Sequence, residues 1–203
     1  MTAPQHWDGV YSRLAANDVS WYEAQPARSL EAIGAARLAP QSAIIDVGAG
    51  ASTLADELLE RGFTDITLLD LSAEVLAAVR QRMGERSCHV QFRQQDVTSF
   101  RPSRPYALWH DRAVFHFLTA AQDRARYRDA LIEGTLPGSH VLIATFGPQG
   151  PLRCSGLETC RYDATSLSKE LGAQFRLLDS VVDTHVTPGG NQQQFLHAHF
   201  LRM

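Results

Sequence analysis

The residues best able to do chemistry gather where short apolar runs end. Asp70, Asp96 and Asp111 each end or closely follow a run rich in β-branched, aromatic or leucine residues, and a glycine-containing stretch, residues 48–52, follows another. Ligands of open α/β sheets bind at the carboxyl ends of the strands. Four such clusters therefore indicate one small-molecule site along one edge of a sheet.

The glycine stretch is suited to a ligand-binding turn. Gly48 and Gly50 let the backbone turn sharply and approach a ligand, and the next helix directs its N-terminal amides toward the same place. The spacing Gly48-x-Gly50-x-Ser52 departs from the G-x-G-x-x-G fingerprint of dinucleotide-binding proteins. Taken alone, the stretch also fits an ordinary strand–helix turn.

Two of the acids suit the sugar and base of a nucleoside. Asp70 follows the glycine turn at the separation expected of an acid that accepts both ribose hydroxyls, although it could instead cap a helix. Asp96 could receive an adenine amino group, or it could be a solvated turn residue.

Residues 109–118 carry the densest set of reactive side chains. His110, Asp111 and Arg112 supply a base, an acid and a fixed cation in adjacent positions, and His116 shares a face with Arg112 if a helical turn follows. We expect these four residues to do the chemistry. The alternative is that Asp111 and Arg112 pair to brace the loop while His116 is a packed histidine.

The remaining pattern predicts the elements that position these residues. β-rich runs alternate with helical patterns, which is typical of an α/β fold with a doubly wound, mostly parallel sheet and helices on both faces. We expect seven strands, at residues 43–47, 66–69, 90–93, 106–109, 141–145, 175–182 and 194–201, and helices at 54–61, 73–83, 120–131 and 165–171. The last two strands lack a helix between them, so the final strand should be antiparallel.

The chain is expected to form a single domain over residues 1–203, with a helical cap at 1–40 and a Rossmann-like core at 41–203. In the cap, Trp7, Val10, Tyr11 and Leu14 share one helix face, and a break falls at Asn17-Asp18.

Composition narrows the class of partner. A net charge of -3 without a basic cluster argues against nucleic acid, and no apolar stretch is long enough to cross a membrane. Three cysteines and no recognisable signal peptide predict a cytoplasmic protein.

Three motifs in order, Ile45–Ser52, Leu68–Ser72 and Gln95–Val97, resemble those of class I, Rossmann-like S-adenosylmethionine-dependent methyltransferases over about residues 40–147. The resemblance implies S-adenosylmethionine as the cofactor, with its amino-acid part at Asp46 and the glycine turn, its ribose at Asp70 and its adenine at Asp96. Many members have glycine where Ser52 stands, and serine fits there if it caps the helix. The expected cofactor-binding residues are Asp46, Gly48, Ala49, Gly50, Ser52, Asp70, Leu71, Ser72, Asp96, Val97 and Trp21.

Two groups within the superfamily resemble this chain. His6-Trp7-Asp8-x-x-Tyr11 and Trp21-Tyr22 are similar to the opening of lysine methyltransferases of elongation factor and citrate synthase. Small bacterial methyltransferases of thiols, thiopurines or metalloid oxyanions have a similar aromatic cap. We expect Trp7, Tyr11 or Trp21 to cover the cofactor, because an amphipathic cap would close the site, although core packing is at least an equal alternative for each.

The resemblance also implies that residues 109–118 face the transferred methyl group. Asp111 would then orient an amine or thiol, and Arg112 would hold a carboxylate or oxyanion. We expect methyl transfer to a small-molecule acceptor. The alternatives are a protein-lysine methyltransferase, a non-catalytic cofactor-binding module and an NAD-dependent oxidoreductase.

The glycine- and proline-rich residues 146–157 are expected to form a lid on the substrate side. Cys154 and Cys160 leave a metalloid site as an alternative, and His197 and His199 share one strand face. We expect no metal site.

Overall fold

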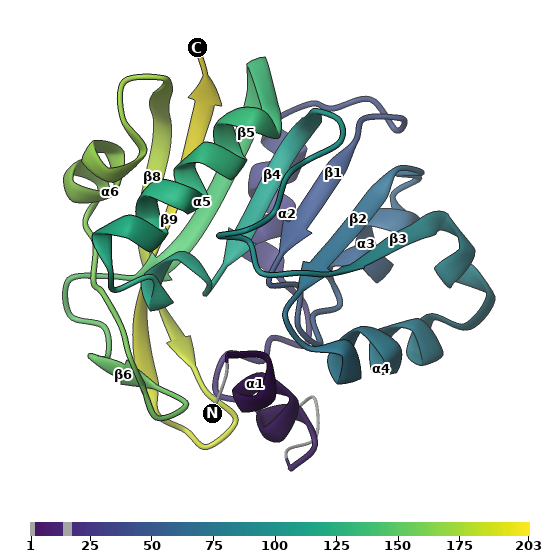
Figure 1. The fold of residues 1–203 in the computed structure, drawn as a ribbon, viewed down its shortest axis with the longest axis horizontal. Coiled ribbons are helices and arrows are strands. Elements are labelled where there is room, and N and C mark those ends of the chain that lie inside the picture. The colour runs from purple at the N-terminus through teal and green to yellow at the C-terminus, as the bar shows by residue number, and fades with distance from the viewer. Residues whose placement is uncertain (1–2, 14–17) are drawn as a thin grey trace.

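A computed structural model describes residues 3–13 and 18–203 of the chain. Seven strands form one sheet in the order β3-β2-β1-β4-β5-β9-β8, and β9 alone runs against the others (Figure 1). The strands of this sheet are β1 (Ile44–Val47), β2 (Ile66–Asp70), β3 (Val90–Gln94), β4 (Tyr106–Arg112), β5 (Thr135–Phe146), β8 (Phe175–Val186) and β9 (Gln192–Arg202). The described helices are α1 (Ala3–Tyr11), α2 (Ala27–Ala35), α3 (Leu54–Glu60), α4 (Ala73–Met83), α5 (Ala121–Glu133) and α6 (Ala164–Leu171), with short 3-10 turns at Gly84–His89 and Phe115–Phe117.

The central strands are buried along their whole length. All residues of β1 and β2 are buried, as expected for parallel strands covered on both faces. In register, Asp46 of β1 lies beside His110 of β4, and Val47 lies beside Asp111. The carboxyl ends of β1, β2 and β4 therefore meet at one edge, as the sequence predicts.

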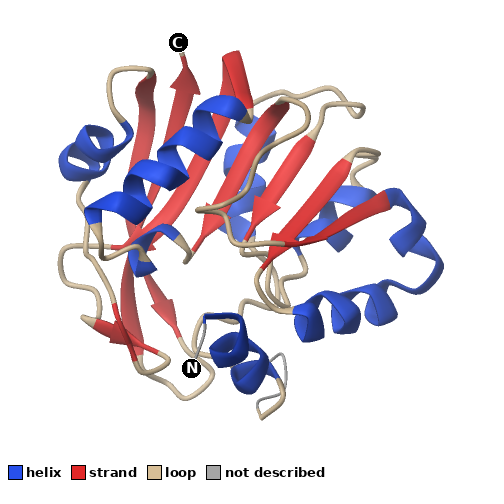
Figure 2. Cartoon of the chain, viewed as in Figure 1, coloured by secondary structure: helices blue, strands red, loops and turns tan. Residues whose placement is uncertain are grey.

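Two apolar clusters lie on opposite faces of the sheet. One packs Val141 and Ile143 of β5 against α5 and α6, and the other packs Leu142 against α2, α3 and α4. Figure 2 shows α5 and α6 in front of the sheet and α2 behind it. The predicted seven-stranded α/β fold with an antiparallel strand is confirmed.

Several boundaries differ from the prediction. β4 continues to Arg112, so Asp111 lies within the strand rather than beyond it, and its side chain is buried. The β8–β9 hairpin is longer than expected. A two-stranded hairpin of β6 (Arg153–Cys154) and β7 (Leu157–Glu158) occupies the loop after β5.

The segment predicted as a cap divides into two parts. α1 lies below the carboxyl ends of the strands, whereas α2 buries Leu30 and Ile33 against the core of the sheet (Figure 1). Leu14 and Asn17 lie outside the described residues. No helix in the described part of the chain is long and apolar enough to cross a membrane.

Candidate functional site

The turn after β1 requires glycine at two positions. Gly48 and Gly50 have φ angles of 62° and 53°, which L-residues with a side chain rarely adopt. A Cβ on Gly48 would lie 2.0 Å from Val114 Cγ2, and one on Gly50 would lie 2.6 Å from the Tyr11 hydroxyl. The missing side chains therefore allow two neighbouring segments to close on the turn.

Asp70 ties this turn to the start of α4. Its carboxylate accepts hydrogen bonds from the backbone amides of Gly50 and Ser72, each at 2.8 Å. Burial raises the pKa of Asp70 to about 6, against the effect of these amides. Asp70 therefore organises the loops and also lines the main cavity.

Ser72 joins α4 to α1. Its hydroxyl oxygen accepts from the amide of Val75 at 3.2 Å, which caps α4, and its hydroxyl group donates to Asp8 Oδ1 at 2.6 Å. The contact with Asp8 attaches the short helix α1 to the start of α4.

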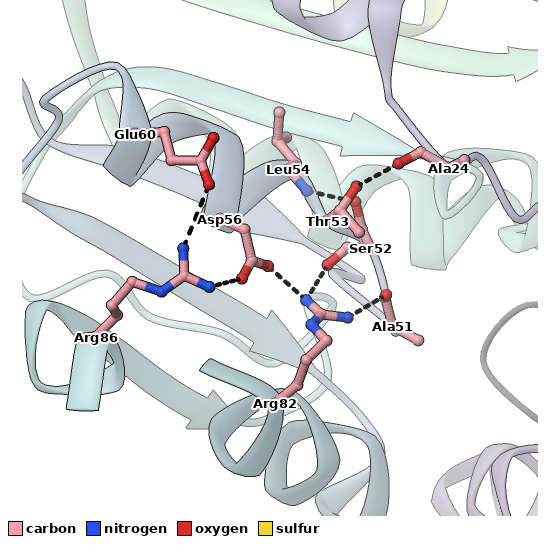
Figure 3. Close-up of polar contacts among 9 residues, drawn as sticks. All are labelled: Ala24, Ala51, Ser52, Thr53, Leu54, Asp56, Glu60, Arg82 and Arg86. Atoms are coloured by element: carbon pink, nitrogen blue, oxygen red, sulfur yellow. Dashed lines mark hydrogen bonds and ion pairs between the residues drawn. The ribbon is translucent and has the colours of Figure 1, made fainter. Parts of the chain in front are cut away.

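A second brace lies behind the turn. Ser52 precedes Thr53, the N-cap residue of α3, and its Oγ accepts from the amide of Leu54 at 3.1 Å, so it supports the start of the helix without being its cap residue. The contact of Arg82 with the turn was missed in the sequence. Arg82 of α4 donates to the carbonyls of Ala51 and Ser52 at 2.8 and 2.7 Å, and also to Asp56 at 2.7 Å (Figure 3). Arginine on a helix carries no distinctive spacing, so only the tertiary structure identifies this contact.

The main cavity has a volume of about 400 Å³ and joins the strand ends to the aromatic residues of α1. Asp96 faces it from a turn in which its carboxylate accepts from the amide and hydroxyl of Thr98, both at 2.8 Å. Among the predicted site residues, the cavity is lined by Trp21, Gly48, Asp70, Leu71, Asp96, Val97 and Arg112.

A smaller hollow of about 40 Å³ lies next to the glycine turn. It collects the predicted residues Asp46, Ala49, Ser52 and His110, and it shares Trp21, Gly48 and Arg112 with the main cavity. Gly50 and Ser72 line neither space, and they act through the hydrogen bonds described above.

Aromatic rings close the far side of the main cavity. Trp7 meets Trp21 and Phe117 edge to face, with ring centroids 5.7 and 5.2 Å apart, and Tyr11 meets Trp21 at 6.3 Å. These four residues form the aromatic wall. Trp7 and Phe117 come from segments far apart in the sequence, and Phe117 was not predicted as a site residue.

Asp111 does not line the cavity beneath α1. Its fully buried carboxylate accepts from the Tyr127 hydroxyl at 2.7 Å and from the amides of Val114 and Phe115 at 3.0 and 3.4 Å. Burial raises the pKa of Asp111 to about 6. These contacts fix the turn after β4, so the geometry supports a bracing role instead of the expected contact with an acceptor. The expected partner Arg112 takes no part in this brace.

His110 does not line the main cavity and bonds to Asp46 and to α2. Its Nδ1 lies 2.6 Å from Asp46 Oδ1, and its Nε2 lies 2.8 Å from the Ser29 hydroxyl of α2. The ring therefore fixes the orientation of Asp46, and it is a positioning residue by its contacts.

His116 is packed inside the protein. Its ring stacks on Phe146 at 4.2 Å, and Nδ1 accepts from the Phe146 amide at 3.2 Å. Burial and the nearby Arg112 lower its pKa to about 3, so the ring is neutral near pH 7. The packed-histidine alternative describes this residue, and its position does not support the expected catalytic role.

Arg112 is the predicted catalytic residue that reaches both spaces. Nη1 donates to the Trp21 carbonyl at 2.7 Å, and Nη2 lies 2.7 Å from Glu23 Oε1. The guanidinium also lies over the Phe195 ring at 5.3 Å. Glu23 was missed because no motif surrounds it.

The loop after β5 contributes Leu157 to the cavity, which agrees with its predicted place on the substrate side. Cys154 is buried, burial raises the pKa of its thiol, and Cys160 is half-buried. The described residues contain no group of three or more His, Cys, Asp or Glu able to hold a metal ion. The cysteines therefore do not form a metalloid centre of that kind with their described neighbours.

Comparison with known proteins shows what part of the chain is similar to. Residues 44–132 match a family model described as a methyltransferase domain. The eEF1A lysine and N-terminal methyltransferase of Mus musculus is 25% identical over 90 residues, which are 44% of this chain and 13% of the mouse protein. The corresponding protein of Danio rerio is 26% identical over 97 residues, 48% of this chain and 14% of its own length. The match thus spans a small part of these curated relatives.

Solved structures of other proteins are similar to this chain over nearly its whole length. The 1,6-didemethyltoxoflavin-N1-methyltransferase of Burkholderia thailandensis has a TM-score of 0.72 and 22% identity, covering 100% of this chain and 92% of that one. A structure from work on conversion of a disulfide bond into a thioacetal group during echinomycin biosynthesis has a TM-score of 0.78 and 19% identity, covering 98% and 93%. The N-methyltransferase NodS of Bradyrhizobium japonicum has a TM-score of 0.70 and 16% identity, covering 97% and 98%.

The family match is confined to residues 44–132, and the sheet around them has the fold of the similar methyltransferase structures. These similarities favour the methyltransferase that the motifs predicted over an NAD-dependent oxidoreductase.

Proposed function

We propose that this protein transfers a methyl group from S-adenosylmethionine to a small-molecule acceptor. The observation that carries the proposal is one continuous cavity of about 400 Å³ that runs from the strand-end acids to the aromatic wall. A continuous space of this kind lets a cofactor and an acceptor lie end to end, and alignment is the main requirement of an in-line displacement.

The residues present fit the cofactor. Gly48 and Arg112 line both the main cavity and the smaller hollow, and the buried Nε of Arg112 has no hydrogen-bond partner among the described residues. We assign the ribose to Asp70, the adenine to Asp96 and Val97, and the amino-acid end to the hollow beside Asp46. When bound, S-adenosylmethionine supplies a methyl group on a positively charged sulfur, which an acceptor lone pair can displace.

The chain's own residues then bind, orient and exclude water. Trp7, Trp21 and Phe117 give the acceptor an apolar, aromatic surface and keep solvent from the reacting centre. The described residues around this wall include neither a histidine nor a cysteine lining the cavity. We therefore propose that the acceptor presents its own lone pair, as a neutral amine, a thiolate or an oxyanion, and that the site positions it.

The neighbouring structures support a small acceptor. The Burkholderia enzyme holds 1,6-didemethyltoxoflavin together with S-adenosylhomocysteine, and its fold matches this chain end to end. A second candidate, protein-lysine methylation, is favoured by the match to the eEF1A methyltransferases. We also propose that residues 1–203 act as a single domain, because α1 and α2 both pack on the core or its site.

Two measurements test this function. Isothermal titration with S-adenosylhomocysteine should show binding at micromolar concentrations, and its absence with the protein folded would overturn the proposal. Methyl-labelled S-adenosylmethionine incubated with a cell extract and the protein should leave label in the small-molecule fraction. Label in protein bands would favour the lysine methyltransferase instead.

A further inference from the structure

Arg112 has more hydrogen-bonding capacity than the protein uses. Its side chain is 12% exposed, Nη2 forms an ion pair with Glu23 Oε1 at 2.7 Å, and the buried Nε has no hydrogen-bond partner among the described residues. Buried donors left unsatisfied destabilise a protein, so such donors at the wall of a hollow indicate a ligand acceptor.

Charges of both signs surround the same hollow. Arg112 lines it together with Glu23 and Asp46, next to the glycine turn. Asp46 is held by the His110 ring at 2.6 Å, and Glu23 faces Arg112 and, at 3.8 Å, His185. One cation beside two carboxylates complements an α-amino-acid group, which carries one carboxylate and one ammonium.

The segment that carries Glu23 is fixed at several points. The Trp21 carbonyl accepts from Arg112, and the Ala24 carbonyl accepts from the Thr53 hydroxyl at 3.3 Å (Figure 3). The Ser20 carbonyl lies 2.8 Å from Nε2 of His185. These bonds place the Glu23 carboxylate above the glycine turn rather than in solvent.

We propose that Arg112 and Glu23 recognise the amino-acid end of S-adenosylmethionine, with Arg112 binding its α-carboxylate and Glu23 its α-ammonium. This assignment rests on the proposed function. The hollow of about 40 Å³ accepts the group when Arg112 and Glu23 turn from each other toward the ligand. A planar guanidinium suits a carboxylate because it can donate two parallel hydrogen bonds. Arg112 is thus a cofactor-binding residue rather than an acceptor-binding one.

Truncated ligands test the assignment without measuring activity. Titration calorimetry is run with S-adenosylhomocysteine, its decarboxylated analogue, its deaminated analogue and 5′-methylthioadenosine, which lacks both groups. Arg112→Met should weaken S-adenosylhomocysteine about 30-fold or more, but leave the decarboxylated analogue and 5′-methylthioadenosine unchanged within about threefold. Arg112→Lys should recover part of the loss.

Glu23→Gln should weaken S-adenosylhomocysteine and the decarboxylated analogue about 10-fold, and leave the deaminated analogue unchanged. The loss is smaller than for Arg112→Met because removing the Glu23 carboxylate also releases Arg112 from its ion pair, so that Arg112 can bind the ligand carboxylate. Arg61→Met is the matched control, since it removes an ion pair with Glu57 on α3, away from the hollow. Arg61→Met should leave the affinity for each of the four ligands unchanged.

Equal weakening of all four ligands by Arg112→Met would overturn the assignment and give Arg112 a structural role. Unchanged affinity for S-adenosylhomocysteine would overturn it as well. A folded wild-type protein that binds none of the four ligands would refute the proposed function itself, so the two failures are distinguishable.

Discussion

The two halves of the site are built in different ways. Between β1 and β3, Asp70 accepts hydrogen bonds from backbone amides of the turns, those of Gly50 and Ser72. After β4, Asp111 and Arg112 also contact side chains of other elements, Tyr127 of α5 and Glu23 of the segment before α2. The first half, called the local half below, is therefore organised by the backbone of its turns, while the second depends on how separate elements pack.

Substitution of Gly48 should give the largest effect, and it tests whether the local half excludes any side chain at this position. Gly48→Ala places a methyl group against Val114 at a positive φ, so we expect about 3 kcal/mol of destabilisation and at least about a 100-fold loss of S-adenosylhomocysteine affinity. Denaturant unfolding and calorimetry measure both.

Gly62→Ala is the matched control for Gly48, since φ is 86° but no atom lies within 4 Å of the added Cβ. It should cost about 1 kcal/mol and leave affinity unchanged. An equal loss of S-adenosylhomocysteine affinity in both variants would show that backbone strain, and not the contact with Val114, causes the loss.

The second half is tested by the pH dependence of Asp111. Because its pKa rises to about 6 in the fold, the native state holds a proton that the unfolded state loses above its ordinary pKa near 4. The free energy of unfolding that this residue contributes therefore falls as pH rises from about 4 to about 6.

Relative to Asp111→Asn, the wild type should lose about 2 to 3 kcal/mol across that range. The difference between the two proteins isolates the aspartate, since His116 and His197 have lowered pKa values and act in the opposite direction. Urea unfolding at a series of pH values measures it. Parallel curves would mean that the carboxylate is not desolvated in the fold.

Asp70→Asn should have an intermediate effect, because an amide nitrogen would replace one of the two oxygens that accept from backbone amides. We expect about a 30-fold weaker affinity for S-adenosylhomocysteine, near 2 kcal/mol. Asp183→Asn, at an exposed ion pair with Arg28, is the control and should bind normally. An unchanged affinity in Asp70→Asn would mean that Asp70 does not contribute to cofactor binding.

Arg82→Gln should have the smallest effect, since the turn keeps its other bonds when the carbonyls of Ala51 and Ser52 lose their donor. About a fivefold loss of affinity, near 1 kcal/mol, is expected. Arg86→Gln shares the Asp56 partner but reaches neither carbonyl, so it should bind ligand as the wild type does (Figure 3). Equal losses would assign the effect to Asp56 rather than to the turn.

The same contrast explains what could be predicted from the sequence. The strand pattern and the glycine turn are short-range signals, so the sheet followed from periodicity, while the cofactor motifs followed from the resemblance to a known family. The ends of the strands could not be predicted: the backbone of β4 pairs with β5 through Asp111, and the side chain of Asp111 is buried against Tyr127 of α5. Glu23, Arg82 and Phe117 carry no motif, since their roles arise when separate segments meet.

The contact between Asp8 and Ser72 has a kinetic consequence. α1 is attached to the start of α4 by this 2.6 Å hydrogen bond and rests on the cavity through its aromatic rings. If a bound product leaves past α1, both attachments must break together. Replacing Asp8 removes one of them, so we expect faster amide exchange in α1 and a shorter residence time of the product.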